Sequence, residues 1–155
     1  MLTLFGGHDC TLDAKGRVLI PGALKKQLTP ILNEGFIIKR SMFQQCLELY
    51  PMPVWNKQMR QINKLNRFIK KNIDFIRLFM AGVHQVELDG AGRLQIPRDL
   101  VLFAELKADI VLSSQTEIIE IWDKVKYEAL NSSSEDIDKE QLAQDVMGNI
   151  PVEDD

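Results

Sequence analysis

The stretch His8-Asp-Cys-Thr-Leu-Asp-Ala-Lys-Gly-Arg-Val-Leu-Ile-Pro-Gly-Ala-Leu24 decides the fold, because a second version of it follows later in this chain of 155 residues. That version is His84-Gln-Val-Glu-Leu-Asp-Gly-Ala-Gly-Arg-Leu-Gln-Ile-Pro-Arg-Asp-Leu100, and every matched residue lies 76 positions after its counterpart. The identical pairs are His8/His84, Leu12/Leu88, Asp13/Asp89, Gly16/Gly92, Arg17/Arg93, Ile20/Ile96, Pro21/Pro97 and Leu24/Leu100. This ungapped match indicates an internal duplication.

Each copy predicts the same order of elements. In the first, apolar residues alternate on either side of Asp-Ala-Lys-Gly, which predicts a strand, a turn and a second strand over residues 10–20. Gly16 occupies the turn position that needs a left-handed backbone. Because proline suits the first turn of a helix, a short helix is expected at 21–28, followed by a loop at 29–35. Two further strands are expected at 36–39 and 46–50.

The second copy repeats this order, with strands expected at 86–88, 94–96, 110–113 and 118–122 and a helix at 97–104. Between the copies, one long amphipathic helix is expected from Pro53 to Gly82, with an apolar stripe at Trp55, Met59, Ile62, Leu65, Ile69, Ile73, Ile76 and Met80. The stripe belongs either to the core or to a subunit interface. The lysines and arginines between its members form either a solvated face or a track along DNA.

Beyond the second copy, a helix is expected at 124–131, and the composition turns polar and acidic from residue 132 onward. One more helix is expected at 138–147, and residues 148–155 are expected to be disordered. The chain therefore divides into a first repeat at 1–52, a basic linker helix region at 53–82, a second repeat at 83–131 and an acidic tail at 132–155.

The net charge of −3 conceals a marked polarity. Residues 1–82 carry 13 Lys and Arg against 5 Asp and Glu, a net +8, whereas residues 83–155 carry 6 against 17, a net −11. Such asymmetry favours a nucleic-acid partner for the basic half, or charge-complementary packing between subunits. A basic solvated helix and an acidic tail account for part of it.

Several classes of protein are disfavoured by the sequence. We expect no signal peptide and no membrane span, because no long apolar stretch is present. Cys10 and Cys46 are too few for a disulfide framework or a zinc cage and are expected to be buried, inert thiols. His8 and His84 have no ligand partners at metal spacing. The chain is therefore expected to be cytoplasmic, with no metal, no cofactor and no small-molecule substrate.

The doubled motif Asp-x-x-x-Arg is the candidate functional feature. Asp13 can accept hydrogen bonds from the amides of its own turn, and Arg17 can either pair with Asp13 or project its donors outward. Asp89 and Arg93 repeat the arrangement. Arg17 is favoured for DNA contact, because Lys15 is its neighbour. Arg93 is favoured for structural pairing, because Ala91 occupies the equivalent position.

The doubled Leu-Asp-x-x-Gly-Arg-x-x-Ile-Pro, with Glu-Leu-Tyr-Pro-x-Pro-x-Trp after the first copy and Ile-Glu-Ile-Trp after the second, resembles the MraZ family of bacterial transcriptional regulators. The resemblance covers roughly residues 1–130. It implies an α+β fold in which two SpoVT-AbrB-type repeats form a pseudo-symmetric swapped-hairpin β-barrel with flanking helices. It also implies a ring-like homo-oligomer that binds promoter direct repeats and represses its own division and cell-wall gene cluster, in association with the nucleoid.

The same resemblance places the DNA-contacting residues near the first motif, at Lys15 and Arg17. A phosphate-binding surface needs accumulated positive charge. The basic residues expected to supply it are Lys15, Arg17, Lys25, Lys26, Lys39 and Arg40.

Three other functions compete with this interpretation. An AbrB-like antitoxin is one, although antitoxins usually carry one motif and a longer tail. A second is an oligomeric interaction protein that does not bind DNA. The third is a hydrolase in which Asp13 and Asp89 share a proton, as in aspartic proteases. Each aspartate is followed by an arginine that would hold it ionised, so we expect no catalytic residues and no enzyme.

Overall fold

A computed structural model describes residues 2–133 and 136–151. The fold is of the α+β class, as expected, and the chain divides into two compact units, residues 1–124 and 125–155. The first unit contains, in order, β1 (Gly7–Thr11), β2 (Arg17–Leu19), α1 (Gly22–Leu28), the 3-10 helix η1 (Thr29–Glu34), β3 (Phe36–Arg40), β4 (Leu47–Pro51), α2 (Met52–Ile62), α3 (Lys70–Phe79), β5 (His84–Val86), β6 (Arg93–Gln95), α4 (Arg98–Phe103), β7 (Asp109–Gln115) and β8 (Ile118–Asp123).

The described strands form two antiparallel sheets. Six strands pair in the order β1-β7-β8-β4-β3-β5, and β2 pairs with β6 in a separate two-stranded ribbon. The expected closed barrel is not observed. The reason is that β2 and β6 are only three residues long and pair with each other. Beside this ribbon the described strands form only isolated bridges, such as those between Leu12 and Val18 and between Leu88 and Leu94, which do not close a barrel.

Neither repeat forms a sheet from its own strands alone. The first strand of each repeat pairs with the third strand of the other, because β1 lies against β7 and β5 lies against β3. The second strands, β2 and β6, pair with each other, and so do the fourth strands, β4 and β8. Residues that are far apart in the sequence are therefore adjacent throughout the first unit.

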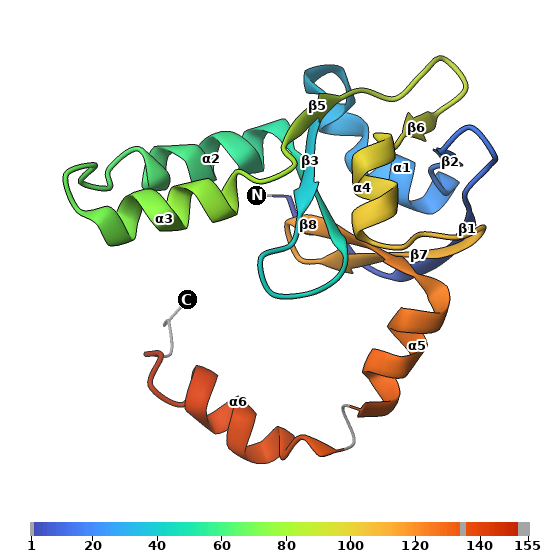
Figure 1. The fold of residues 1–155 in the computed structure, drawn as a ribbon. Coiled ribbons are helices and arrows are strands. Elements are labelled where there is room, and N and C mark those ends of the chain that lie inside the picture. Colours follow the sequence, from blue (N-terminus) through green and yellow to red (C-terminus); the bar gives the residue numbers. More distant parts are fainter. Residues whose placement is uncertain (1, 134–135, 152–155) are drawn as a thin grey trace. The chain divides into compact units, whose positions relative to one another are not determined.

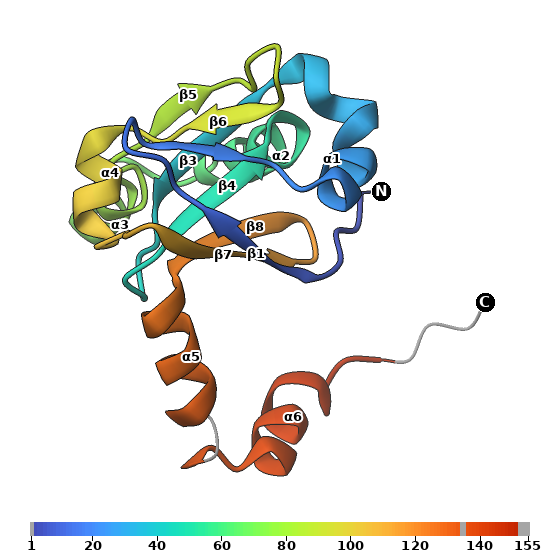
Figure 2. The same ribbon diagram turned by 90° about the vertical axis from the view of Figure 1, so that its right-hand side faces the viewer.

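The six-stranded sheet is covered on both faces. Successive side chains of a strand point to opposite faces, so Ile38 and Leu49 enter one core while Ile37 and Tyr50 enter another. The larger core includes inner side chains of the ribbon and of α1 and α4. The smaller core is completed from the helical pair by Trp55, Ile62 and Phe79. Figure 1 shows the β2–β6 ribbon and the α2–α3 pair on opposite sides of the sheet, and Figure 2, turned by 90°, shows α2 and α3 behind it.

The prediction of a single long helix at 53–82 is wrong. Two helices, α2 and α3, occupy this region and lie side by side as a hairpin (Figure 1). Asn66 organises the break, because its side-chain oxygen accepts a hydrogen bond from the Phe68 amide at 2.9 Å and its carbonyl accepts one from Asn72 Nδ2 at 3.0 Å. A short polar side chain that bonds to nearby backbone competes with helix continuation in this way.

Most other expected elements are present. Gly16 has φ +79°, as its place in the turn predicts. The loop expected at 29–35 is instead the 3-10 helix η1, in which Pro30 is accommodated near the start. Within the described residues, no helix has the length and apolar character needed to cross a membrane.

The second unit contains the two helices that the sequence predicts. They are α5 (Lys124–Ser133), which begins at the last residue of the first unit, and α6 (Lys139–Met147). Asp138 caps α6 by accepting a hydrogen bond from the Gln141 amide at 3.1 Å. Of the residues expected to be disordered, 152–155 lie outside the described residues, whereas 148–151 are described and the Ile150 amide donates to the Met147 carbonyl at 3.2 Å.

Candidate nucleic-acid interface

Asp13 organises the first motif turn. Its Oδ1 accepts hydrogen bonds from the amides of Lys15 and Arg17, both at 2.9 Å, and its Oδ2 accepts one from Arg17 Nε at 2.8 Å. The backbone closes the same turn, because the Asp13 amide donates to the Arg17 carbonyl at 2.9 Å. The arginine side chain is thus held at its Nε edge by a fixed carboxylate.

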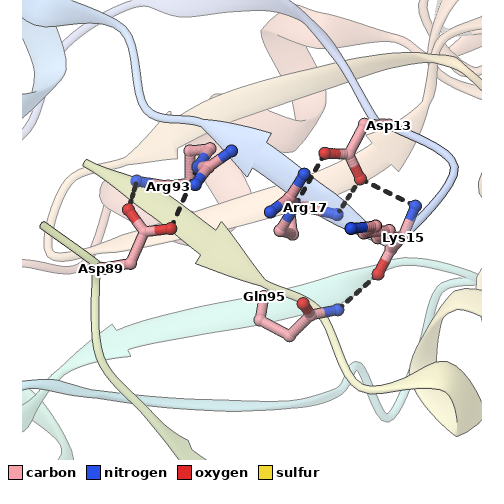
Figure 3. A network of polar contacts seen from close by, with 6 residues as sticks. All are labelled: Asp13, Lys15, Arg17, Asp89, Arg93 and Gln95. Carbon is pink, nitrogen blue, oxygen red and sulfur yellow. Dashed lines mark hydrogen bonds and ion pairs between the residues drawn. The ribbon is translucent and has the colours of Figure 1, made fainter. Parts of the chain in front are cut away.

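The second motif turn has the same construction. Asp89 Oδ1 accepts from the amides of Ala91 and Arg93 at 2.9 Å, and Asp89 Oδ2 accepts from Arg93 Nε at 3.0 Å. The expected structural pairing is therefore present in both repeats (Figure 3). The local role of Asp13 and Asp89 is therefore to hold the side chain of one arginine each.

Both aspartates are held ionised. The pKa of Asp13 is lowered, first by the backbone amide of Arg17 and further by the Arg17 side chain, and the pKa of Asp89 is lowered in the same way by Arg93. A pair of carboxylates that shares a proton requires one raised pKa. This geometry therefore disfavours the hydrolase alternative.

The β2–β6 ribbon brings the two motifs onto one surface. In its register Arg17 lies opposite Gln95, and Leu19 lies opposite Arg93. Directly opposed residues of an antiparallel pair share a face, and so do residues two apart, so these four side chains form the outer face of the ribbon. The inner face is made by Val18 and Leu94, both fully buried, whereas Leu19 is 60% exposed.

Bonds between the repeats fix the two turns against the ribbon. Gln95 Nε2 donates to the carbonyl of Lys15 at 2.7 Å, as Figure 3 shows. The Ile96 amide donates to the Gly16 carbonyl at 2.8 Å, and the Ile20 amide donates to the Gly92 carbonyl at 3.1 Å. Each turn is therefore bonded to the strand of the other repeat, which makes the outer face one unit.

This joint surface was not predicted from the sequence. Different roles were expected for Arg17 and Arg93 because their neighbours differ, and no role was expected for Leu19 or Gln95. The sequence did contain a signal for both residues. Each lies two residues after an arginine in the second strand of its repeat, so it shares a face with that arginine, and the apolar residue between them points to the opposite face. What the sequence did not show is that the two strands pair with each other.

The remaining predicted residues lie in different places. Lys15 is exposed on the first turn, and Lys25 and Lys26 are exposed on α1. The ammonium of Lys25 lies beside the second motif turn, 3.1 Å from the position that a Cβ on Gly92 would occupy. The first repeat thus contributes a lysine next to the arginine of the second.

The placement of Lys39 contradicts its expected DNA contact. Its side chain is 0% exposed, and its Nζ lies 3.2 Å from Glu48 Oε1 and 4.5 Å from the centre of the Phe79 ring. The same Nζ donates to the Arg40 carbonyl at 2.5 Å. Lys39 is thus a buried cation that links β3 to β4 and α3.

Arg40 lies away from the ribbon, at the end of β3. Its guanidinium stacks over Phe103, with the carbon of the group 5.0 Å from the ring centre, and its Nε is buried. It also lines a cavity of about 450 Å³ with the β3–β4 loop. The structure therefore gives Arg40 a packing role at a site separate from the two motif turns.

The sequence matches the family described as "MraZ protein, putative antitoxin-like" over residues 3–77 and again over 79–149. The chain belongs to the MraZ family. It is 58% identical over 150 residues to the transcriptional regulator MraZ of Christiangramia forsetii, with 96% of each chain covered. It is 57% identical over 151 residues to that of Flavobacterium psychrophilum, covering 97% of this chain and 95% of the relative. The protein of Clostridium tetani is 32% identical over 139 residues, covering 90% and 93%.

These relatives of the MraZ family are named transcriptional regulators, a family without enzymatic activity. The prediction that this chain is not an enzyme is therefore confirmed. The two matched segments, 3–77 and 79–149, also agree with the duplication that the sequence indicates.

Proposed function

We propose that this chain binds double-stranded DNA through the outer face of the β2–β6 ribbon. The observation that carries the proposal is the pairing of the two repeats there, which places Arg17, Leu19, Arg93 and Gln95 on one exposed surface. The major groove of B-DNA admits a two-stranded β-ribbon. An arginine at each end of such a ribbon suits contact with base edges or with flanking phosphates.

The held arginines retain the donors that DNA recognition needs. Among the described contacts, each aspartate occupies the Nε of its arginine, so the two terminal nitrogens of Arg17 and of Arg93 stay available. This pair of nitrogens can donate to O6 and N7 of guanine or to a phosphate. Gln95 can bond to adenine and Leu19 can contact a thymine methyl group. Because the aspartates orient the arginines beforehand, binding orders fewer side chains.

A finer description of the fold belongs to the same proposal. We interpret the first unit as a pseudo-symmetric swapped-hairpin structure of the AbrB type, in which residues 1–52 and 83–131 are equivalent halves. The support is the reciprocal strand pairing, with β1 on β7 and β5 on β3, and the reciprocal bonds of the two motif turns. Residues 53–82 then join the halves and residues 132–155 form an acidic tail.

The resemblance supports the physiological part of the proposal. We propose that this protein acts in the cytoplasm, associated with the nucleoid, as a repressor of its own division and cell-wall gene cluster. A ring-like homo-oligomer would contact adjacent promoter direct repeats, and such multivalency raises affinity without new contacts. Large exposed apolar side chains, including Phe43 at 86% and Phe68 at 100% exposure, are consistent with association between copies.

The test uses a DNA fragment from upstream of the protein's own gene and a scrambled fragment of equal length. Wild type should prefer the first fragment. Arg17→Ala and Arg93→Ala should each weaken specific binding by about 5- to 150-fold, which corresponds to about 1–3 kcal/mol per lost base contact, with the larger loss at Arg17. Arg60→Ala removes the same charge from the exposed surface of α2 and should leave selectivity unchanged.

Two results would refute the proposal. One is equal affinity of wild type for both fragments. The other is a loss of selectivity in Arg60→Ala that equals the loss in Arg17→Ala, because DNA would then follow the helical hairpin. Circular dichroism and the oligomeric state of each variant show whether the fold is intact.

A further inference from the structure

A groove of about 670 Å³ lies beside the first motif turn. One wall is the turn itself, residues 12–16 of the first repeat, and the other comes from the second repeat at Arg98 and residues 106–108. Its apolar lining is formed by Leu12, Ile96, Val101 and Leu106. The groove therefore exists only because the two repeats meet at the ribbon.

Three cations line this groove: Lys15, Arg98 and Lys107. All three side chains belong to exposed residues, and none forms an ion pair within the described part of the chain. The acidic residue in the lining is Asp13, whose charge is already matched by Arg17 at 2.8 Å. The groove thus presents three cationic groups, and the carboxylate of its own lining is already paired with Arg17.

The groove is continuous with the outer face of the ribbon. Gln95 belongs to both, because it lines the groove and lies opposite Arg17 in the strand register. Its side chain also fixes the Lys15 carbonyl at 2.7 Å (Figure 3). An elongated polyanion that lies on the ribbon therefore reaches the groove without leaving the protein surface.

We propose that this groove is a phosphate-binding site for one strand of the DNA backbone, contacted by Lys15, Arg98 and Lys107. The inference rests on the proposed DNA binding and adds to it two contact residues from the acidic half of the sequence. Phosphate oxygens are the groups that clustered arginine and lysine side chains bind best at a polar surface. Such contacts position the duplex and carry no base preference.

The groove makes the two ends of the ribbon differ in positive charge. The positions that correspond to Lys15 and Arg98, 76 residues away in the other repeat, are Ala91 and Gly22. The opposite end of the ribbon therefore lacks cations equivalent to Lys15 and Arg98, although Lys25 lies beside Gly92 there. The backbone is held more strongly at the first motif turn, so a pseudo-symmetric ribbon binds its site in one orientation.

The test compares wild type with the double variant Arg98→Gln/Lys107→Gln on the upstream and the scrambled fragment over a range of salt concentrations. The double variant should lose affinity for both fragments by the same factor. The slope of log K against log salt should become shallower by about one for each phosphate contact removed. The matched control is Lys64→Gln/Lys71→Gln, which removes the same charge from exposed positions of the α2–α3 region and should leave the slope unchanged.

A second measurement locates the contact on the DNA. Single phosphates of the upstream fragment are replaced by neutral methylphosphonates, and wild type should be sensitive on one flank of its site more than on the other. That one-sided sensitivity should disappear in Arg98→Gln/Lys107→Gln. Equal sensitivity on both flanks in wild type would overturn the proposed direction.

The outcomes separate this inference from the function on which it rests. If wild type selects the upstream fragment and Arg17→Ala abolishes that selection, while the groove variant matches the lysine control, the groove is not a phosphate site and the proposed function stands. If wild type selects no fragment, the proposed function fails and the groove assignment fails with it. Binding of inorganic phosphate that the groove variant loses, with unchanged DNA affinity, would assign the groove to a small anion instead.

Discussion

The buried Lys39 gives a prediction that separates the sequence interpretation from the structure. If Lys39 contacted DNA, its replacement would weaken DNA binding and leave stability unchanged. In the structure its Nζ is fully buried, 3.2 Å from Glu48 and 4.5 Å from the Phe79 ring centre. Lys39→Met keeps most of the side-chain volume and removes the charge, so it isolates the electrostatic contribution.

Removing one partner of a buried ion pair costs about 3–5 kcal/mol, because the other charge is left unpaired. The Glu48 side chain is 17% exposed and also accepts a hydrogen bond from the Tyr50 hydroxyl at 3.3 Å, which favours the lower end of that range. For a chain of this size, about 3 kcal/mol lowers the midpoint of thermal unfolding by about 6–12 °C.

Urea unfolding of Lys39→Met, Glu48→Gln and the double variant measures the coupling between the two charges. The double variant should recover most of the stability that Lys39→Met loses, because replacing both charges leaves no unpaired charge in the core. DNA affinity of folded Lys39→Met should equal that of wild type. Unchanged stability together with reduced DNA affinity would refute the buried role and restore Lys39 to the DNA surface.

Three further predictions concern the turns and the core. Gly16→Ala and Gly92→Ala each place a side chain at a φ near +80°, which costs about 1–2 kcal/mol. Gly16→Ala should cost more, because its Cβ would lie 3.3 Å from the Ile96 carbonyl oxygen, and equal urea midpoints would contradict this. Burial raises the pKa of the Cys46 thiol to about 12, so native protein should resist alkylation by iodoacetamide at pH 8 until urea unfolds it, as mass spectrometry can show. The lowered pKa of Asp13 means that its contribution to stability is present above the ordinary aspartate pKa of about 4 and is lost as the pH falls through the folded value. Asp13→Asn should flatten the dependence of the thermal midpoint on pH in that acidic range, and an unchanged dependence would show that the turn does not need the ionised carboxylate.

Local signals in the sequence predicted most of the fold. The repeated turn, with Gly16 and Pro21 at fixed distances from Asp13, determines a strand, a turn, a strand and a helix over a short segment. These features depend on backbone preferences of neighbouring residues, so a single sequence contains them. The same reasoning found the duplication and the aspartate–arginine pairs.

Long-range pairing could not be predicted in the same way. Arg17 and Gln95 lie opposite each other although 78 positions separate them, and no local pattern specifies that register. The burial of Lys39 depends on Phe79, which reaches it from a different element. The break in the linker helix depends on Asn66, whose side chain accepts from the Phe68 amide and whose carbonyl accepts from the Asn72 side chain. These bonds outweigh an uninterrupted apolar stripe.

Photo-crosslinking from defined positions of this chain to the upstream DNA fragment tests most directly whether the β2–β6 ribbon lies on DNA. A photoreactive phenylalanine analogue replaces Leu19, which is 60% exposed on the outer face of the ribbon, or Phe68, which is 100% exposed between α2 and α3. We expect a crosslink to DNA from position 19 and none from position 68. A crosslink from position 68 alone would show that the helical hairpin, and not the ribbon that joins the two repeats, lies on DNA.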